Sequence, residues 1–217
     1  MIEVLYTNMI EHFIKKRWKT GKKGQKMNLE KYLKEDEIIN FSHPSIQTLA
    51  KALSKDCIDD EAIAKSCFLY VRDTIKHIGD IKEGYNSSKA SDVLKYKTAL
   101  CYGKSHLLAA LLRANDIPTG LCYQRLSCNE YVKDSYCVHG LNAVYLKKYG
   151  WYRIDPRGNK DGIDAQFQPP HEKLAFEIGE GEYDIDGIFD KPLEKIIESL
   201  SKYKTYEEIK DNIPDIQ

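Results

Sequence analysis

The sequence predicts an α+β domain in which a central, cysteine-bearing helix packs against an antiparallel β-sheet. Residues 107–114 are apolar with one exception, and a helix that is apolar on most of its circumference belongs in the middle of a domain. Helical patterns fill residues 42–114, extended segments follow between residues 119 and 178, and helical patterns return after Pro192. Helices, then a cluster of strands, then helices again is the order typical of an α+β domain.

The composition and net charge of the chain exclude some classes of function. Hydrophobic residues make up 42% of the chain and charged residues 30%, as in ordinary globular proteins. The formal net charge is zero, so no overall field attracts the protein to nucleic acid or to an anionic membrane. No apolar run reaches membrane-spanning length, and the basic residues near the N-terminus follow the apolar ones, the reverse of a signal peptide. We therefore expect a cytoplasmic protein with neither a nucleic-acid nor a membrane partner.

The chain divides into an N-terminal extension, residues 1–40, and one domain, residues 41–217. Within the extension, residues 9–18 suggest a short amphipathic helix, and the basic, glycine-punctuated run from Lys15 to Lys26 is typical of a solvated loop. A contact of this run with nucleic acid is the minority interpretation, because the whole chain is neutral. We expect residues 37–41 to form a short strand that leads into the domain.

The elements of the domain follow from local signals. Pro44 begins one helix, and the acidic group Asp59–Glu61 opens a second helix that we expect to end at His77, acting there as a cation. After the central helix, Pro118 forces an extended chain. A later helix follows Pro192, and Thr205 with Glu208 forms a capping box for the last one. The predicted strands are residues 119–126, 136–145, 151–155 and 174–178, with the second and third joined by a hairpin that turns at Gly150.

Three residues in this framework form a candidate catalytic site. Cys101 is at the start of the central helix, where free N–H groups and the helix dipole favour a thiolate. His139 is on the second predicted strand and Asp155 ends the third, so the hairpin can bring the two together if the register places them on one face. A nucleophile, a base and an orienting carboxylate are the groups that covalent acyl transfer needs. The backbone N–H of Cys101 is a candidate oxyanion donor.

The sequence around these residues resembles that of the transglutaminase-like superfamily of papain-type folds. The matching segments are Ala99-Leu-Cys101, then residues 107–118 ending in Arg113-Ala-Asn-Asp-Ile-Pro118, the segment His139–Tyr145, and Trp151-Tyr-Arg-Ile-Asp-Pro156. Upstream, residues 70–75 are similar to the helix before the family's core. The resemblance covers about residues 42–160. It implies a transglutaminase-like or papain-like core with Cys101 as nucleophile, His139 as base and Asp155 as the residue that orients it.

This resemblance implies an enzyme that attacks amide or peptide carbonyls of a protein, peptide or amide substrate, by hydrolysis or by transfer to an amine. The triad needs no metal or organic cofactor, so we expect none. Two positions depart from the family pattern: Ala99 replaces a glycine, and Gly140-Leu141 follows the histidine where alanine and an aromatic residue are usual. The departures leave open a catalytically inactive domain that serves as a protein-interaction module.

Several other residues have open roles. The second oxyanion donor has three candidates, Tyr85, Tyr96 and Gln124, and His106 is interpreted as a packing residue. The six cysteines are expected to be reduced because no export signal is recognised. A zinc site is a third hypothesis, although its spacings match no familiar motif, as is a regulatory disulfide that would join Cys101 to a nearby cysteine. The residues of the zinc hypothesis are Cys122, Cys128, Cys137 and His139.

Overall fold

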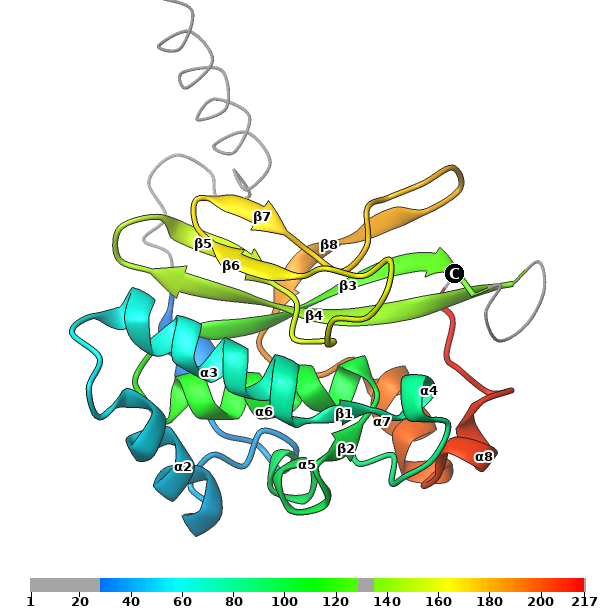
Figure 1. The fold of residues 1–217 in the computed structure, drawn as a ribbon, viewed down its shortest axis with the longest axis horizontal. Helices are drawn as coiled ribbons and strands as arrows, with labels where there is room; N and C mark the ends of the chain where they lie inside the picture. The colour runs from blue at the N-terminus through cyan, green and yellow to red at the C-terminus, as the bar shows by residue number, and fades with distance from the viewer. Residues whose placement is uncertain (1–27, 129–134, 217) are drawn as a thin grey trace, which may run out of the picture.

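The computed structural model describes residues 28–128 and 135–216, so the predicted helix at residues 9–18 and the basic run Lys15–Lys26 lie outside the described residues. A four-stranded sheet lies over the helices, and a small hairpin lies on its opposite face (Figure 1). The helices are η1 (Glu30–Leu33), α2 (Pro44–Ser54), α3 (Asp60–Thr74), α4 (Ile78–Ile81), α5 (Ala90–Tyr96), α6 (Cys101–Arg113), α7 (Glu194–Lys202) and α8 (Tyr206–Ile209). The strands are β1 (Lys76–His77), β2 (Thr98–Ala99), β3 (Thr119–Ser127), β4 (Tyr136–Leu146), β5 (Gly150–Ile154), β6 (Gln166–Gln168), β7 (His171–Lys173) and β8 (Tyr183–Phe189).

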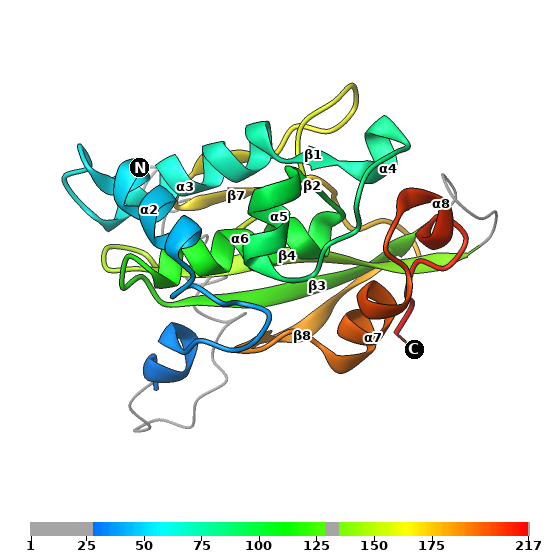
Figure 2. The same ribbon diagram turned by 90° about the horizontal axis from the view of Figure 1, so that it is seen from below.

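Helix α6 is the centre of the fold, as its apolar sequence predicts. Every residue from Cys101 to Arg113 is buried, and the helix packs against β3 and β4 on one side and against α2, α3 and α5 on the others (Figure 2). Because a helix surrounded on all sides cannot shift without disturbing each neighbour, its first residue is held in a fixed position. None of the described helices is long and apolar enough to cross a membrane.

The main sheet has the order β5-β4-β3-β8 and is antiparallel throughout. The predicted hairpin is confirmed: β4 and β5 pair from Asn142 with Ile154 to Leu146 with Gly150, and Gly150 has φ +75°, a conformation that glycine adopts without strain. This register places the residue after β5, Asp155, beside the middle of β4.

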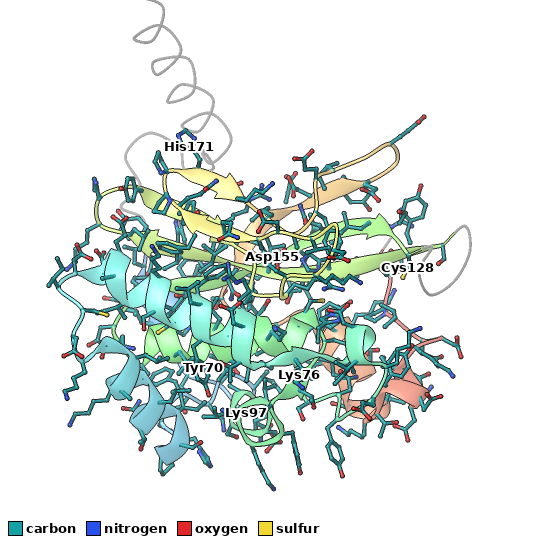
Figure 3. The ribbon with its side chains drawn as sticks, viewed as in Figure 1. Tyr70, Lys76, Lys97, Cys128, Asp155 and His171 are labelled. Carbon is teal, nitrogen blue, oxygen red and sulfur yellow. The ribbon has the colours of Figure 1, made fainter. Side chains whose placement is uncertain are left out.

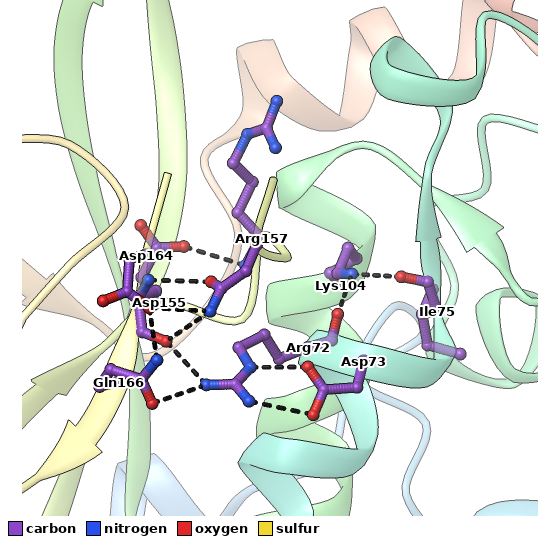
Figure 4. Close-up of polar contacts among 10 residues, drawn as sticks. Arg72, Asp73, Ile75, Lys104, Asp155, Arg157, Asp164 and Gln166 are labelled. Carbon is purple, nitrogen blue, oxygen red and sulfur yellow. Dashed lines mark hydrogen bonds and ion pairs between the residues drawn. The ribbon is translucent and has the colours of Figure 1, made fainter. Parts of the chain in front are cut away.

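The main sheet and α6 are joined by buried polar side chains as well as by the apolar core. Asn142 on β4 donates from Nδ2 to the carbonyl oxygen of Ser105 at 3.0 Å. The ammonium of Lys104 on α6 donates to the carbonyls of Arg72, at 3.1 Å, and of Ile75, at the end of α3 (Figure 4). Burial, together with the nearby Arg157 guanidinium, lowers the pKa of Lys104 to about 7. Lys104 therefore fixes the last turn of α3 to α6 one turn from Cys101.

Three sequence predictions of local structure are wrong. Residues 37–41 bend instead of forming a strand, because the Asp36 carboxylate accepts the N–H groups of Ile38 (2.8 Å) and Ile39 (2.7 Å) in a local turn. The segment 174–178 is irregular, and the fourth strand of the main sheet is β8 instead. Helix α3 ends at Thr74, so His77 is not a C-terminal cation of that helix: it lies in β1, and burial keeps its pKa well below the ordinary value.

Candidate active site

Cys101 begins α6 and faces the edge of β4. The preceding residue, Leu100, is extended and its side chain does not cap the helix, so the first N–H groups of α6 have no partner within the helix. The Cys101 sulfur accepts a hydrogen bond from the backbone N–H of Gly140 at 3.4 Å. Only 7% of Cys101 is exposed. Cys101, the nucleophile predicted from the sequence, is thus a nearly buried thiol between the start of α6 and the edge of β4.

His139 and Asp155 meet across the hairpin. The His139 Nε2 atom lies 2.7 Å from Asp155 Oδ2, with both side chains buried. Two backbone N–H groups, those of Arg157 and Ala175, also donate to the Asp155 carboxylate, each at 3.1 Å. In Figure 3 Asp155 lies at the level of the sheet, in the interior of the molecule. Since Asp155 occupies Nε2, only the Nδ1 atom of His139 remains to interact with Cys101.

Electrostatics couple the three groups. Burial alone lowers the pKa of His139, but the Asp155 carboxylate and the Cys101 sulfur outweigh it and raise that pKa to about 10. Burial likewise raises the pKa of Asp155, and the facing imidazole with the two backbone N–H donors reverses this, leaving the pKa below its ordinary value. At neutral pH the pair is therefore an imidazolium hydrogen-bonded to a carboxylate.

Cys101 and His139 line a cavity of about 1120 Å³ to which both the sheet and the irregular segment 174–178 contribute. Asp155 pairs with His139 and does not itself line the cavity. Phe176 from that segment packs edge-on against the His139 ring, with centroids 4.9 Å apart. Sequence reasoning missed Phe176 and the Ala175 N–H donor, because segment 174–178 was predicted to be a sheet strand. No local pattern distinguishes a segment that folds over a site from a strand with the same residues.

Of the three candidates for the second oxyanion donor, only Gln124 lines this cavity. It pairs with His139 across β3 and β4, and its Nε2 donates to Asp184 Oδ1 at 3.0 Å. Tyr85 and Tyr96 stack on each other at the surface, with ring centroids 4.4 Å apart and 54% and 39% of their surface exposed. His106 is buried away from the cavity, with Nδ1 2.8 Å from the Ser88 carbonyl oxygen, as expected for a packing residue.

The residues of the zinc hypothesis do not converge. Cys128, Cys137 and His139 line the cavity, but Cys122 does not, and its sulfur lies 3.9 Å from the Gly187 carbonyl oxygen. In the described part of the chain, no group of three or more His, Cys, Asp or Glu residues has an arrangement that could hold a metal ion. All six cysteines are free thiols. A hydrogen bond with the Cys128 thiol, together with burial, raises the pKa of Cys137.

Comparison with known proteins identifies the family of the chain. The family profile of the transglutaminase-like superfamily matches residues 47–156, just over half of the 217 residues, and the chain belongs to this superfamily. The family resemblance and the fold class predicted from the sequence are both confirmed. No curated protein matches the chain.

Three solved structures are similar in fold. They are a candidate cysteine protease from Cytophaga hutchinsonii (16% identity, TM-score 0.49, 62% of this chain and 43% of that one), a candidate protease from Parabacteroides distasonis (12%, 0.39, 65% and 30%) and a TGase (16%, 0.36, 77% and 41%). The chain spans less than half the length of each of these proteins.

Proposed function

We propose that this protein is a cysteine-dependent acyl-transfer enzyme that acts on amide or peptide carbonyls through Cys101, His139 and Asp155. One observation carries the proposal. His139, paired with the buried Asp155 at 2.7 Å, lines the same cavity as Cys101, whose sulfur is held by the N–H of Gly140 at 3.4 Å. A nucleophile and a base at a common cavity, with a carboxylate that orients the base, define this chemistry by geometry and role.

Acylation begins when the proton of the Cys101 thiol resides on His139, so that the thiolate attacks the substrate carbonyl carbon and forms a C–S bond. The carbonyl oxygen takes the negative charge and is stabilised by the free N–H of Cys101, which the helix start leaves unpaired. Gln124 is the candidate for the second donor, because its amide has one N–H left after the bond to Asp184. The imidazolium of His139 gives its Nδ1 proton to the leaving amine as the C–N bond breaks.

Deacylation reverses these roles. His139, now neutral, removes a proton from water or from an incoming amine, which attacks the thioester and releases Cys101. Asp155 remains ionised throughout and keeps the Nε2–H of His139 directed towards itself, so that Nδ1 always faces the reacting atoms. Water gives a carboxylic acid, as in an amidase or peptidase, and an amine gives a new amide, as in transamidation. The substrate of the proposal is a protein, a peptide or a smaller amide, and the cavity volume is of the size that holds such groups.

Selective alkylation tests the proposal. We expect iodoacetamide at neutral pH, followed by mass spectrometry of each cysteine, to label Cys101 faster than Cys57, which is more exposed. His139→Ala should slow the labelling of Cys101 about tenfold or more, because the imidazolium that stabilises a thiolate is lost. His171→Ala, at an exposed histidine, is the matched control and should leave the rate unchanged. If Cys101 reacts no faster than the other accessible thiols in the folded protein, the catalytic proposal fails and the alternative of a binding-only domain gains support.

A further inference from the structure

The edge of β4 next to Cys101 lacks a neighbouring strand. Strand β5 pairs with β4 only over Asn142–Leu146, and no described strand covers residues 136–141 on the side away from β3. An open strand edge presents a row of backbone N–H and C=O groups that an extended peptide can pair with. This row leads directly to the candidate nucleophile.

Three backbone groups on this open edge have identified partners. The N–H of Gly140 donates to the Cys101 sulfur at 3.4 Å, and the carbonyl of Val138 accepts from the hydroxyl of Tyr102. The N–H of Val138 donates to the carbonyl oxygen of Pro214 at 2.9 Å. Residues two apart on a strand are roughly 7 Å apart. A segment near the C-terminus therefore occupies the backbone site next to the one that holds the thiol.

We call residues 213–216 the C-terminal strap. Its carboxylate, Asp215, forms a two-point ion pair with Arg125 on β3, with Nε–Oδ1 and Nη2–Oδ2 distances of 2.7 Å each. The Arg125 guanidinium also lies over the Tyr136 ring, 4.0 Å from its centroid, which fixes its plane. Ile213 forms part of the wall of the cavity that contains Cys101.

The strap is attached in a way that allows replacement. Pro214 has no N–H, so it makes a single backbone bond to β4, and Val138 retains the Tyr102 hydroxyl as partner of its carbonyl. In the described part of the strap, the attachment comprises one backbone hydrogen bond, one ion pair, the burial of Pro214, and the packing of Ile213 and Ile216 against the core. A peptide in the same extended conformation could form the same backbone hydrogen bond, ion pair and apolar packing.

We propose that the open edge of β4 is a docking site for an extended peptide with an acidic side chain, and that the C-terminal strap occupies it as an autoinhibitory contact. In this arrangement Arg125 is the specificity-determining residue that pairs with the acidic side chain. The inference rests on the proposed function only in that the docked peptide is the substrate, or a segment next to its scissile amide. The docking itself needs no chemistry at Cys101.

The test uses the 217-residue chain and a fluorescein-labelled peptide with the sequence of residues 210–217, Lys-Asp-Asn-Ile-Pro-Asp-Ile-Gln. Asp215→Lys places a like charge against Arg125 and releases the strap. By fluorescence anisotropy, this variant should bind the peptide at least roughly tenfold more tightly than the wild type does, because the docking site is no longer filled in cis. Asp211→Lys, an exposed position in the same segment, is the matched control and should behave like the wild type.

Charge reversal checks the role of Arg125. A peptide in which the second Asp is replaced by Lys should lose binding to the Asp215→Lys variant. In the double variant Arg125→Glu/Asp215→Lys the strap pairs again with reversed charges, so binding of the original peptide should return to the wild-type level or below. If the Asp215→Lys protein is folded and binds no better than the wild type, the inference is overturned.

A milder variant covers the case in which Asp215→Lys disturbs folding. Asp215→Asn should raise both peptide affinity and the hydrogen-exchange rate of the Val138 amide, and an unchanged affinity and exchange rate would contradict the inference. A Cys101→Ala background separates the two proposals, because peptide docking should persist in it. Slow alkylation of Cys101 in the Asp215→Lys variant, with peptide docking intact, would refute only the proposed chemistry, whereas selective alkylation without docking would refute only the strap.

Discussion

At the scale of single residues, Asp155 is the group on which the candidate site depends most. It is completely buried and uses its carboxylate to fix the His139 ring and two backbone N–H groups at once. A buried carboxylate with all of these partners satisfied is stable, but removal of its charge leaves the imidazolium without compensation. The residue therefore combines a structural and an electrostatic role.

Asp155→Asn tests that electrostatic role. The amide keeps the shape of the carboxylate but not its charge, so the pKa of His139 should fall and less imidazolium should be present at neutral pH. We expect alkylation of Cys101 to slow about tenfold or more, and any acyl-transfer activity to fall by roughly 10²- to 10⁴-fold. Asp164→Asn removes the same charge from an exposed position on the wall of the cavity that Cys101 and His139 line, and should change neither rate. If the two variants change these rates equally, the rates depend on the overall charge near the cavity and not on the His139–Asp155 hydrogen bond.

The pH dependence of stability is a second residue-scale prediction. The pKa of His139 is about 10 in the folded protein, against roughly 6.5 for an unfolded histidine. A raised pKa contributes stability that is complete below about pH 6.5 and is lost as the pH rises towards 10. Urea unfolding between these limits should therefore show a free energy of unfolding that falls more steeply for the wild type than for His139→Gln, by at most about 1.4 kcal/mol per pH unit. Parallel slopes would mean that His139 is neutral in the folded state.

At the scale of secondary structure, the sequence located the elements with strong local signals and missed those formed by tertiary contacts. Helix α6 and the β4–β5 hairpin were predictable because apolar spacing, Pro118 and Gly150 are local features. Strand β8 was missed because its residues, Tyr183–Phe189, alternate weakly and lie partly exposed at the sheet edge. The candidate triad could be proposed from the order of its residues along the chain and from the geometry of the predicted hairpin. The positions of the irregular segment 174–178 and of the strap could not be predicted, since their partners are distant in sequence.

One departure from the family pattern, Gly140, has a physical reason at this scale. Gly140 faces Tyr102 of α6, and a Cβ at this position would lie 2.9 Å from the Tyr102 Cδ1 atom. An alanine here would push β4 away from the start of α6. Glycine at this position thus permits the close approach that lets the Gly140 N–H reach the Cys101 sulfur.

Gly103→Ala tests how tightly α6 is enclosed. In an exposed helix, alanine stabilises by about 1 kcal/mol relative to glycine. Here the added Cβ would collide with the Ser87 carbonyl oxygen and lie 2.8 Å from the Ala99 Cβ, so we expect a loss of about 1–3 kcal/mol in the free energy of unfolding. Ser105→Ala on the same helix is the control: its buried hydroxyl has no hydrogen-bond partner in the described structure, and its removal should be neutral or stabilising. A stabilising Gly103→Ala would show that the helix has room to move.

At the scale of the whole molecule, distant parts of the chain are joined around Arg113. Its buried guanidinium donates to the carbonyls of Lys34, Thr119 and Asp190, with distances between 2.6 and 3.0 Å. The segment before the first long helix, the start of β3 and the end of β8 thus meet at one side chain. The arginine of the family-like sequence Arg113–Pro118 consequently has a structural role that its sequence pattern alone does not reveal.

This connection bears on the boundary between the extension, residues 1–40, and the domain, residues 41–217, which the sequence suggested. Residues just before the boundary contact the domain closely: Tyr32 packs against Trp151, with ring centroids 4.7 Å apart, and Ile39 is completely buried in the main core. We propose that the folded domain begins upstream of Ile39. Its core then includes residues that composition alone assigns to the extension.

Ile39→Ala tests this boundary. If Ile39 is a full member of the core, its truncation removes buried apolar surface and leaves a cavity, and the free energy of unfolding should fall by about 2–5 kcal/mol. Ile58→Ala is the matched control, because the same side chain is 93% exposed there and its truncation should change stability by less than about 0.5 kcal/mol. Both values come from urea denaturation of the 217-residue chain. If the Ile39→Ala protein is as stable as the Ile58→Ala protein, the core tolerates loss of the Ile39 side chain. The domain would then begin near residue 41, as the sequence suggested.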